Sequence, residues 1–337
     1  MTDGMNDTVR WGILSTANIG RKVVTPALQA SHNGKVVAVA SRSAAQAEGY
    51  AKELGIKRFY GDYDALLADP DVDAIYIPLP NSLHKPWTLR ALEVGKHVLC
   101  EKPLGLNAQE CLDMHAVAAQ NGRVLMEAFM YRFHPRTERA LEHLRIGTLG
   151  DLKLVRAGFT FTVSNPDNIR LQPDLGGGAL MDVGCYCVNA GRTLLGREPV
   201  EAQAFAVWSE QGVDKSLVGV LRFEGDVFVQ FHCALDTARQ EFVEVVGSGG
   251  RIRLESAFLP GLSDAVIETV RSGGKHSEET ISGADEYRLM GEHFADCVLN
   301  GTEPRYSALE AAANMAALGA LYKSARNGGK PVEVEQL

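Results

Sequence analysis

Two groups of residues in this chain have types and spacing suited to chemistry on a bound ligand. The first is Glu101-Lys102-Pro103, directly after the apolar run 97–100. Ligands bind at the carboxyl ends of strands in open parallel sheets, and a lysine there has few structural reasons to follow a buried strand. Pro103 fixes the backbone that follows the lysine. We therefore expect Glu101 and Lys102 to lie beside a bound nucleotide.

The second group lies further along the chain, where three consecutive glycines, 176–178, precede a predicted helix over residues 178–195. On an α-helix, Asp182, Tyr186 and Asn189 share one face, whereas most other side chains of the segment are apolar. A polar stripe on such a helix is either a solvent face or one wall of a polar cleft. The glycines let the backbone pass close to another surface, which favours the cleft.

Together, the two groups fit a hydride transfer. Hydride transfer between a nicotinamide and a carbinol or carbonyl needs a proton partner at the substrate oxygen. Tyr186 can be that partner if a nearby cation favours its ionised form, and Lys102 could supply the charge. Asp182 could orient the lysine or a substrate hydroxyl. Two structural alternatives stay open, namely a Tyr186 hydroxyl satisfied inside the fold and a Lys102–Asp182 ion pair.

The turn after the first predicted strand, residues 9–14, resembles a dinucleotide-binding turn in degraded form. The fingerprint G-x-G-x-x-G reads here as Ser15-x-Ala17-x-x-Gly20. Serine and alanine are small, so the backbone can still approach a phosphate at a helix N-terminus. An ordinary tight strand-to-helix turn is the alternative. The predicted cofactor-binding residues of this turn are Ser15, Thr16, Ala17, Asn18 and Ile19.

The end of the second predicted strand, residues 36–40, indicates which dinucleotide binds. An NAD site usually has a carboxylate there to hold the ribose 2′-hydroxyl. This chain has Ser41 and Arg42 instead, and a guanidinium beside a hydroxyl suits a 2′-phosphate. We therefore expect NADP(H) to be preferred over NAD(H), with a solvated loop arginine as the alternative.

A loop at 78–84 follows the fourth predicted strand, and its prolines stiffen the same edge of the sheet. We count Leu79, Asn81 and His84 among the cofactor-binding residues. Asn81 or Ser82 could instead cap the next helix. His84 could face the cofactor or sit in the first turn of that helix.

The elements around these residues change character midway along the chain. Apolar strands alternate with amphipathic helices over residues 9–127, which predicts a parallel sheet with helices on both faces. From residue 151 onward, period-two alternation and a hairpin signal at 224–226 predict a mostly antiparallel open sheet. We expect an α/β fold with a Rossmann domain at 1–130 and an α+β substrate and oligomerisation domain at 131–337, whose last helix could pack back on the first domain.

Composition excludes several classes of protein. The net charge of −8 and the absence of basic runs disfavour a nucleic-acid partner. No window approaches the ~18 apolar residues of a membrane span, and no signal peptide is visible. The six cysteines form no CxxC pair, so we expect reduced buried thiols, no metal site and a cytoplasmic location.

These motifs, in this order, resemble the glucose–fructose oxidoreductase and inositol dehydrogenase family, often called Gfo/Idh/MocA. The likeness covers nearly the whole chain, and its strongest markers are Glu101-Lys102-Pro103 and the segment 176–186. Within the family, the chain is most similar to the branch of NADP-dependent D-xylose dehydrogenases and dimeric dihydrodiol dehydrogenases. Segments 12–17, 40–42, 127–135 and 182–189 carry that narrower likeness.

The resemblance implies Lys102 near the nicotinamide, Tyr186 as proton donor or acceptor, and a homodimer or homotetramer formed through the open sheet. It adds Arg170 and Asn189 to Asp182 and Tyr186 as substrate residues. It favours an aldose 1-dehydrogenase of the D-xylose type. Reduction of a keto-sugar or of 1,5-anhydrofructose and oxidation of a trans-dihydrodiol are the enzymatic alternatives, and an NADP-binding sensor is the non-enzymatic one.

Overall fold

The structure, a computed structural model, describes residues 8–337, and the chain divides into two compact units. The first unit extends to Gly105 and also contains Gln109–Met130 and Asp285–Ala311. The second contains Leu106–Ala108, Tyr131–Ala284 and Ala312–Leu337. Residues 285–311, which the sequence places in the domain at 131–337, belong to the first unit in the structure. Each unit is described by itself below.

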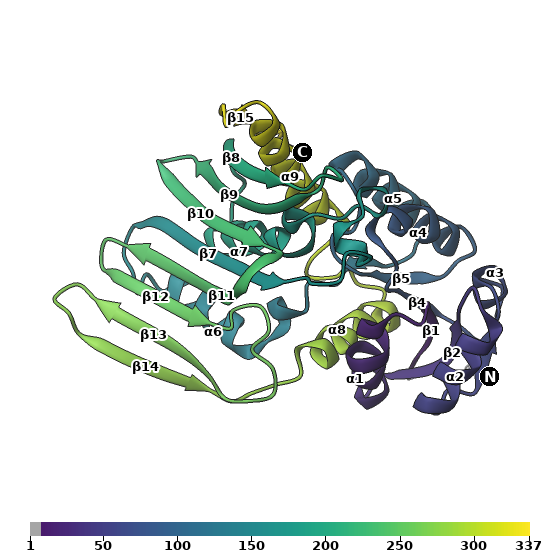
Figure 1. Ribbon diagram of the computed structural model, residues 1–337. Helices are drawn as coiled ribbons and strands as arrows, with labels where there is room; N and C mark the ends of the chain where they lie inside the picture. The colour runs from purple at the N-terminus through teal and green to yellow at the C-terminus, as the bar shows by residue number, and fades with distance from the viewer. Residues whose placement is uncertain (1–7) are drawn as a thin grey trace. The chain divides into compact units, whose positions relative to one another are not determined.

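The first unit is built on a parallel sheet of six strands in the order β3-β2-β1-β4-β5-β6, the order of a dinucleotide-binding fold (Figure 1). Its strands are β1 (Val9–Leu14), β2 (Gly34–Ala40), β3 (Arg58–Tyr60), β4 (Ala74–Ile77), β5 (His97–Cys100) and β6 (Leu125–Glu127). Its helices are α1 (Thr25–Ala30), α2 (Ala44–Leu54), α3 (Tyr63–Leu67), α4 (His84–Glu93), α5 (Ala108–Gln120) and α8 (Glu286–Asn300). The predicted Rossmann fold is confirmed.

Helix α8 belongs to this unit because its side chains complete the core beside β1. The rings of Trp11 and Phe294 lie 5.0 Å apart between centroids, and both are fully buried. The amide of Asn33 donates to the Glu292 carbonyl over 2.9 Å and to a carboxylate oxygen of Asp296 over 2.7 Å. An aromatic contact and two buried hydrogen bonds thus hold a distant segment of the chain against the first strands.

The second unit is built on a nine-stranded sheet in the order β14-β13-β12-β11-β7-β10-β9-β8-β15. Its pairs are antiparallel except β10 with β7, which are parallel. Its strands are β7 (Leu152–Thr162), β8 (Glu201–Trp208), β9 (Asp214–Phe223), β10 (Val227–Ala234), β11 (Asp236–Gly247), β12 (Gly250–Glu255), β13 (Ala265–Arg271), β14 (His276–Ile281) and β15 (Val332–Glu333). The predicted large, mostly antiparallel sheet is confirmed.

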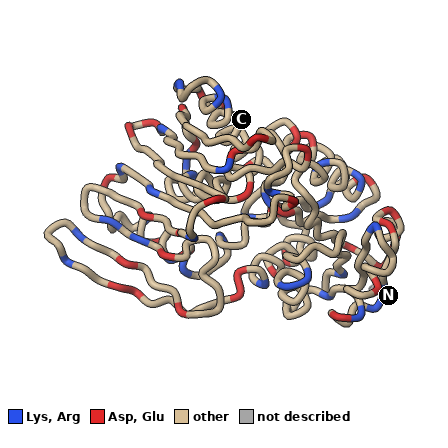
Figure 2. The backbone as a smooth tube through the Cα atoms, viewed as in Figure 1, with Lys and Arg blue, Asp and Glu red and all other residues tan. Residues whose placement is uncertain are grey.

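Helices cover one face of this sheet and leave the other open (Figure 1). They are α6 (Pro135–Arg145), α7 (Cys185–Leu195) and α9 (Ala308–Arg326). Charged residues of both signs lie along β12 to β14 (Figure 2), and some of them pair across strands, as Arg251 does with Glu268. Exposed apolar side chains gather instead at β8 and β9, where Phe205 and Val207 are each 56% exposed and Val218 is 54% exposed.

Several elements differ from the sequence prediction. The period-two alternation that begins at residue 151 corresponds first to one continuous strand, β7, at the centre of the sheet. Helix α6 and strands β3, β8, β14 and β15 were not predicted, because they are short, amphipathic or at sheet edges. Across residues 8–337, every helix is too short or too polar to traverse a lipid bilayer.

Candidate active site

In the first unit, the turn after β1 is built around Ser15, which takes the first fingerprint position. Its φ of 148° lies in a region that favours glycine. The hydroxyl of Ser15 donates to the Pro78 carbonyl over 3.1 Å and accepts from the Ala17 amide over 3.2 Å. The serine side chain therefore ties the turn after β1 to the loop after β4, and these bonds offset the backbone strain.

The helical segment that follows the turn begins at Asn18 and passes through a π-helical turn (Gly20–Val24) into α1. At Gly20, a Cβ atom would lie 3.1 Å from the Tyr50 hydroxyl and 3.6 Å from the Pro78 side chain. Gly20 thus serves the helix-packing role of the third fingerprint glycine. The Tyr50 hydroxyl is 2.8 Å from that of Thr25, and burial raises the pKa of Tyr50 to about 12.

The tip of β2 holds a buried serine and an exposed arginine. The backbone amide of Ser41 donates to the Tyr60 carbonyl over 3.1 Å, and Ser43 caps helix α2. Arg42 is exposed, and its guanidinium interacts with the Tyr63 hydroxyl. The side chain that would read a 2′-phosphate therefore lies at the surface of the sheet edge, where a nucleotide can reach it.

The loop after β4 is held by His84, which is fully buried. Its two ring nitrogens lie 2.8 Å from the carbonyl oxygens of Leu79 and Pro103. Burial lowers the pKa of His84 despite these contacts, so we treat the ring as neutral, with one N–H donating. Both nitrogens face the backbone, so the role of His84 is to join the loops after β4 and β5 rather than to hydrogen-bond a nucleotide.

Neither Asn81 nor Ser82 caps helix α4, which was the alternative role that the sequence left open for them. Both lie in a single 3₁₀ turn (Asn81–Leu83) whose first residue is preceded by Pro80, and neither that turn nor α4 has a side-chain cap. The turn closes through the Leu83 amide, which donates to the Pro80 carbonyl over 2.8 Å. Helix α4 therefore begins from a turn that is closed by a backbone hydrogen bond and has no side-chain cap.

Glu101 and Lys102 follow β5 directly, as predicted. The Tyr76 hydroxyl donates to the Glu101 carboxylate over 2.6 Å, which fixes the glutamate against the neighbouring strand β4. Lys102 is partly exposed, and its peptide bond to Pro103 is cis. Because all six strands are parallel, the residues after β1, β2, β4 and β5 share one edge of the sheet. The first unit thus gathers the predicted cofactor-binding residues at that edge.

In the second unit, the three glycines bring the chain close to the backbone of Arg170. The amide of Gly178 donates to the Arg170 carbonyl over 2.8 Å, and a Cβ atom on Gly177 would lie 2.5 Å from the same oxygen. Gly178 has a φ of 126°, which an L side chain rarely adopts. The predicted close approach of the glycine segment is confirmed, and the surface approached is the Arg170 turn (Ile169–Leu171).

Asp182 lies in a π-helical turn (Leu180–Gly184) that leads into α7. Its carboxylate accepts a hydrogen bond from Nε of Arg170 over 2.7 Å. The side chain of Asp182 is 14% exposed and that of Arg170 is 38% exposed, so the pair lies at the surface of the unit. Arg170 and Asp182, two of the predicted substrate residues, therefore form an ion pair with each other.

Tyr186 lies on the first turn of α7 within a cluster of aromatic rings. The centroid of its ring is 5.3 Å from that of Phe258 and 5.5 Å from that of Phe159. Tyr131 lies on the same cluster, 6.0 Å from Tyr186 between centroids. Tyr186 is 6% exposed, so its ring has a fixed place in the unit. A tyrosine held in this way can present its hydroxyl in one direction.

Comparison with known proteins agrees with both units. Residues 9–129 match the GFO/IDH/MocA oxidoreductase family, described as having an NAD-binding Rossmann fold. Residues 137–253 match the GFO/IDH/MocA C-terminal domain. The chain belongs to the GFO/IDH/MocA oxidoreductase family. The family expected from the sequence motifs is confirmed.

Individual members of the family are similar over most of their length. The chain is 42% identical over 319 residues to D-xylose 1-dehydrogenase (NADP(+)) 2 of Haloferax volcanii, which covers 94% of this chain and 98% of the relative. It is 37% identical over 303 residues to trans-1,2-dihydrobenzene-1,2-diol dehydrogenase of Mus musculus, which covers 87% and 89%.

A solved structure of a 3-ketoreductase from Actinomadura kijaniata, in complex with NADP and TDP-benzene, has a TM-score of 0.90 to this chain. The two are 31% identical, with 94% of this chain and 98% of that chain covered. Solved structures of the same enzyme include variants with a lysine replaced by alanine or glutamate and a tyrosine replaced by phenylalanine.

The fourth predicted substrate residue of this GFO/IDH/MocA chain, Asn189, lies in the interior. It is fully buried, and its Oδ1 accepts a hydrogen bond from the Tyr131 hydroxyl over 2.6 Å. We therefore assign Asn189 a structural role in place of the predicted substrate contact. Tyr131 itself belongs to segment 127–135, one of the segments that carry the narrower family likeness, and its ring contacts that of Tyr186.

An acidic residue that the sequence pattern did not indicate, Glu241, supports the cluster of aromatic rings around Tyr186. Glu241 is buried, and one carboxylate oxygen accepts from the Phe258 amide over 2.7 Å and from the Leu259 amide over 2.6 Å. Its other oxygen pairs with Arg239 over 2.7 Å. A glutamate flanked by glutamine and phenylalanine in a strand pattern carries no sequence signal for such a role.

Proposed function

We propose that this chain is an NADP-dependent oxidoreductase that oxidises a sugar or cyclic polyol, with an aldose of the D-xylose type, oxidised at C1, as the leading substrate. The observation that carries the substrate class is the likeness to the D-xylose 1-dehydrogenase of Haloferax volcanii over nearly the whole of both chains. The fold supports it, because the Rossmann unit and the second sheet unit each match a domain of the family, over residues 9–129 and 137–253.

The residues at the edge of the first sheet fit NADP. The tip of β2 carries Ser41 and the exposed Arg42 where an NAD site has a carboxylate. Gly20 allows the helix after the Ser15 turn to pack closely against Tyr50 and Pro78. We propose that the N-terminus of this helix binds the pyrophosphate. The named cofactor of the Haloferax volcanii relative, NADP(+), agrees with this assignment.

In the proposed reaction, the bound nicotinamide supplies hydride transfer at the substrate carbon. Tyr186 takes the proton from the substrate hydroxyl, and its aromatic surroundings keep the hydroxyl in one orientation. Asp182, held by Arg170, orients a substrate hydroxyl. Within the first unit, Lys102 places a positive charge at the sheet edge where we propose that the nicotinamide binds.

A panel assay tests this proposal. Purified protein is incubated with NADP+ or NAD+ and a series of aldoses, inositols and trans-dihydrodiols, and formation of the reduced nicotinamide is followed by absorbance. We expect turnover of D-xylose or a similar aldose, with NADP+ preferred by at least about tenfold. Protein that binds NADPH yet turns over none of the compounds would point to the sensor and reject the enzymatic proposal.

Reduction of a keto-sugar is the second candidate, and the structural likeness to the Actinomadura kijaniata 3-ketoreductase favours it. The same assay run in reverse, with NADPH and keto-sugars or 1,5-anhydrofructose, separates the two. A kcat/KM for a keto-sugar that exceeds the value for every aldose would make reduction the assigned activity.

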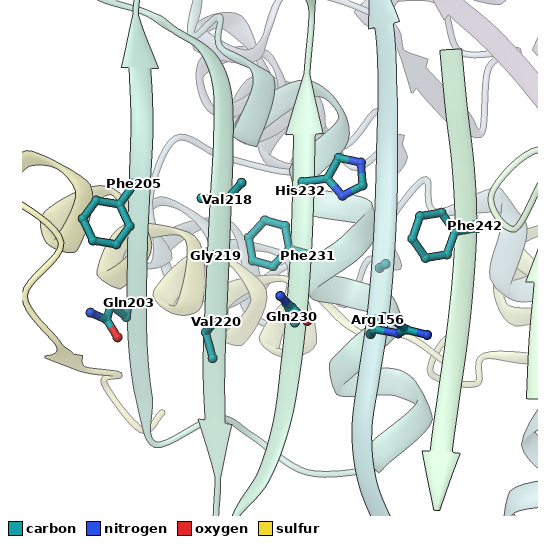
Figure 3. Close-up of a pocket in the computed structure, with 11 residues that line it drawn as sticks. Arg156, Gln203, Phe205, Val218, Gly219, Val220, Gln230, Phe231, His232 and Phe242 are labelled. Carbon is teal, nitrogen blue, oxygen red and sulfur yellow. The ribbon is translucent and has the colours of Figure 1, made fainter. Parts of the chain in front are cut away.

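We propose in addition that two copies of the chain associate through the open face of the nine-stranded sheet. A pocket of about 440 Å³ lies on this face, and its side chains form two rows across the strands (Figure 3). Phe205, Val218, His232 and Phe242 form one row, and Gln203, Val220, Gln230 and Arg156 form the other. Apolar and hydrogen-bonding rows beside charges of both signs suit a self-complementary interface.

Sedimentation velocity tests the interface. We expect a dimer or tetramer for the unaltered protein and a smaller species for Val218→Glu, because a charge at the middle of the apolar row would be buried on association. Val94→Glu is the control, since Val94 is 55% exposed on the first unit. If Val218→Glu and Val94→Glu form an oligomer of the same size, the interface lies elsewhere on the protein.

We also propose that the protein works in a reducing compartment such as the cytoplasm. All six cysteines lie in the described part of the chain, and each is a buried thiol outside any disulfide. Burial raises the pKa of Cys187 and Cys233 well above the ordinary value for a thiol, so neither is prone to oxidation.

A further inference from the structure

A buried carboxylate connects the start of the helix that carries Asp182 and Tyr186 to the last helix of the chain. Asp214, the first residue of β9, is 1% exposed. Its Oδ2 accepts a hydrogen bond of 2.7 Å from the Leu180 amide, and its Oδ1 accepts one of 2.7 Å from the hydroxyl of Tyr322 on α9. All of these residues lie in the second unit.

The Leu180 amide belongs to the first turn of the helix, where backbone N–H groups have no partner within the helix itself. A carboxylate at this end satisfies one of them and interacts favourably with the helix dipole. Gly178, two residues before Leu180, leaves space for the Asp214 carboxylate because it has no side chain. A Cβ atom on Gly178 would lie 2.2 Å from Oδ1 of Asp214 and 2.9 Å from the Tyr322 hydroxyl. The glycine segment and the carboxylate are therefore fitted to each other.

We propose that Asp214 and Tyr322 are positioning residues for the reaction, because they fix the first helical turn that presents Asp182 and Tyr186. The proposal rests on the function proposed above. Leu180 is two residues before Asp182 and six before Tyr186 in the chain, so a shift of its amide moves both side chains. Small displacements of a proton partner from the reacting oxygen lower the rate of the chemical step.

A buried carboxylate at this place carries a desolvation cost that a neutral cap would avoid. Burial raises the pKa of Asp214 to about 6, while the hydrogen bonds from Tyr322 and Leu180 and the charge of Arg326 lower it. The groups that face it are Tyr322 and Arg326 on α9 and Cys233 on β10. Asparagine offers the same shape without the cost of a buried charge. The stronger hydrogen bonds of a carboxylate hold the turn more rigidly, which matters for catalysis.

The chain offers a matched pair of variants on one helix. Tyr322→Phe removes the hydroxyl that binds Asp214. Ser324→Ala removes another buried hydroxyl of α9, which accepts from the Ala204 amide and donates to the Lys330 carbonyl, away from the helix start. Both changes remove buried hydrogen bonds, so both lower the melting temperature. Only Tyr322→Phe loosens the turn at Leu180.

The test compares kcat, KM and hydrogen exchange for the two variants and for Asp214→Asn and Asp214→Ala. We expect Tyr322→Phe and Asp214→Ala to lower kcat on the order of tenfold with the KM for NADP+ unchanged, Ser324→Ala to keep kcat within about twofold, and Asp214→Asn to lie between. Equal kcat for Tyr322→Phe and Ser324→Ala would overturn the proposal.

Amide exchange of a peptide spanning the turn (Leu180–Gly184) gives a readout that does not depend on the substrate. We expect faster exchange in Tyr322→Phe than in Ser324→Ala, and equal protection would also overturn the proposal. If the unaltered enzyme turns over no sugar, the proposed function fails, and the exchange result alone then decides whether Asp214 and Tyr322 hold the turn.

Discussion

The guanidinium of Arg170 donates to the carboxylate of Asp182 over 2.7 Å and lies 5.7 Å from the centroid of the Phe161 ring. The sequence alone left Asp182 with Lys102 as a possible ion-pair partner. Within the second unit, its partner is an arginine from the turn that the glycines approach. Arg170 therefore holds the carboxylate that we propose to orient a substrate hydroxyl.

Replacing Arg170 by alanine should weaken sugar binding more than it weakens the fold. We expect the KM for the sugar to rise by roughly tenfold, while the KM for NADP+ stays within about twofold. Both partners reach solvent, so the free energy of unfolding should fall by less than about 1 kcal/mol. Steady-state kinetics and thermal unfolding give these values.

Arg139→Ala is the control for that experiment, since Arg139 forms exposed ion pairs with Glu142 and Glu279, away from the glycine segment. An unchanged sugar KM in Arg170→Ala, or the same change in the control, would remove Arg170 from the substrate site.

Replacing Arg42 by alanine should change which dinucleotide binds. We expect the binding free energy of NADPH to weaken by about 1.5–3 kcal/mol, the contribution of a hydrogen bond to a charged group. The binding free energy of NADH should stay nearly constant. Titration of nucleotide fluorescence measures both. Lys52→Ala removes an exposed cation from helix α2 and should affect neither. Equal losses for NADPH and NADH would show that Arg42 does not contact the 2′-phosphate.

At Ser15, glycine and alanine should have different effects. Both remove the hydroxyl that binds the Pro78 carbonyl, but only glycine relaxes the φ of 148°. We expect Ser15→Gly to be more stable than Ser15→Ala by about 1 kcal/mol in the free energy of unfolding. Chemical denaturation of the two variants measures the difference, and equal stability would mean that the turn stores no strain at this residue.

The stability of the protein should depend on pH through Asp214. Its pKa is raised from 3.8 to about 6, mainly by burial. Between about pH 4 and pH 6 the unfolded chain loses this proton first, so the folded state binds more protons and the free energy of unfolding falls as pH rises. Above pH 6, this effect lowers the free energy of unfolding by its full amount, about 3 kcal/mol.

Asp214→Asn removes this titration while leaving the other groups unchanged. The free energy of unfolding of the unaltered protein minus that of the variant should fall by about 3 kcal/mol from pH 4 to pH 7. Urea denaturation at several pH values measures this difference. If the difference between the two free energies of unfolding stays constant with pH, the raised pKa of Asp214 is contradicted.

Sequence periodicity predicted the Rossmann sheet and the place of Lys102, because buried parallel strands are near-continuous apolar runs and the residue after such a run must stand at the sheet edge. It could not predict the partner of Asn189, since Tyr131 is distant in the chain and meets it only through packing. The same holds for His84, whose carbonyl partners come from two separate loops.

The helix after the glycines shows a second limit. The polar stripe of Asp182, Tyr186 and Asn189 assumed α-helical spacing, but the first turn is π-helical. A π-helical turn has a wider spacing, which rotates Asp182 relative to the residues that follow. No side chain in the segment signals this change. The predicted helix was therefore right in extent, but the faces its residues share were not determined by spacing alone.

The most direct test of the account is the rate of NADPH formation from NADP+ and D-xylose by Tyr186→Phe and by the unaltered protein, with NADPH affinity measured for both. We expect the variant to lose at least about a hundredfold in kcat, the usual contribution of a proton-transfer group, and to bind NADPH with unchanged affinity. A variant that turns over D-xylose at nearly the rate of the unaltered protein would contradict the assignment of Tyr186 and, with it, the proposed mechanism.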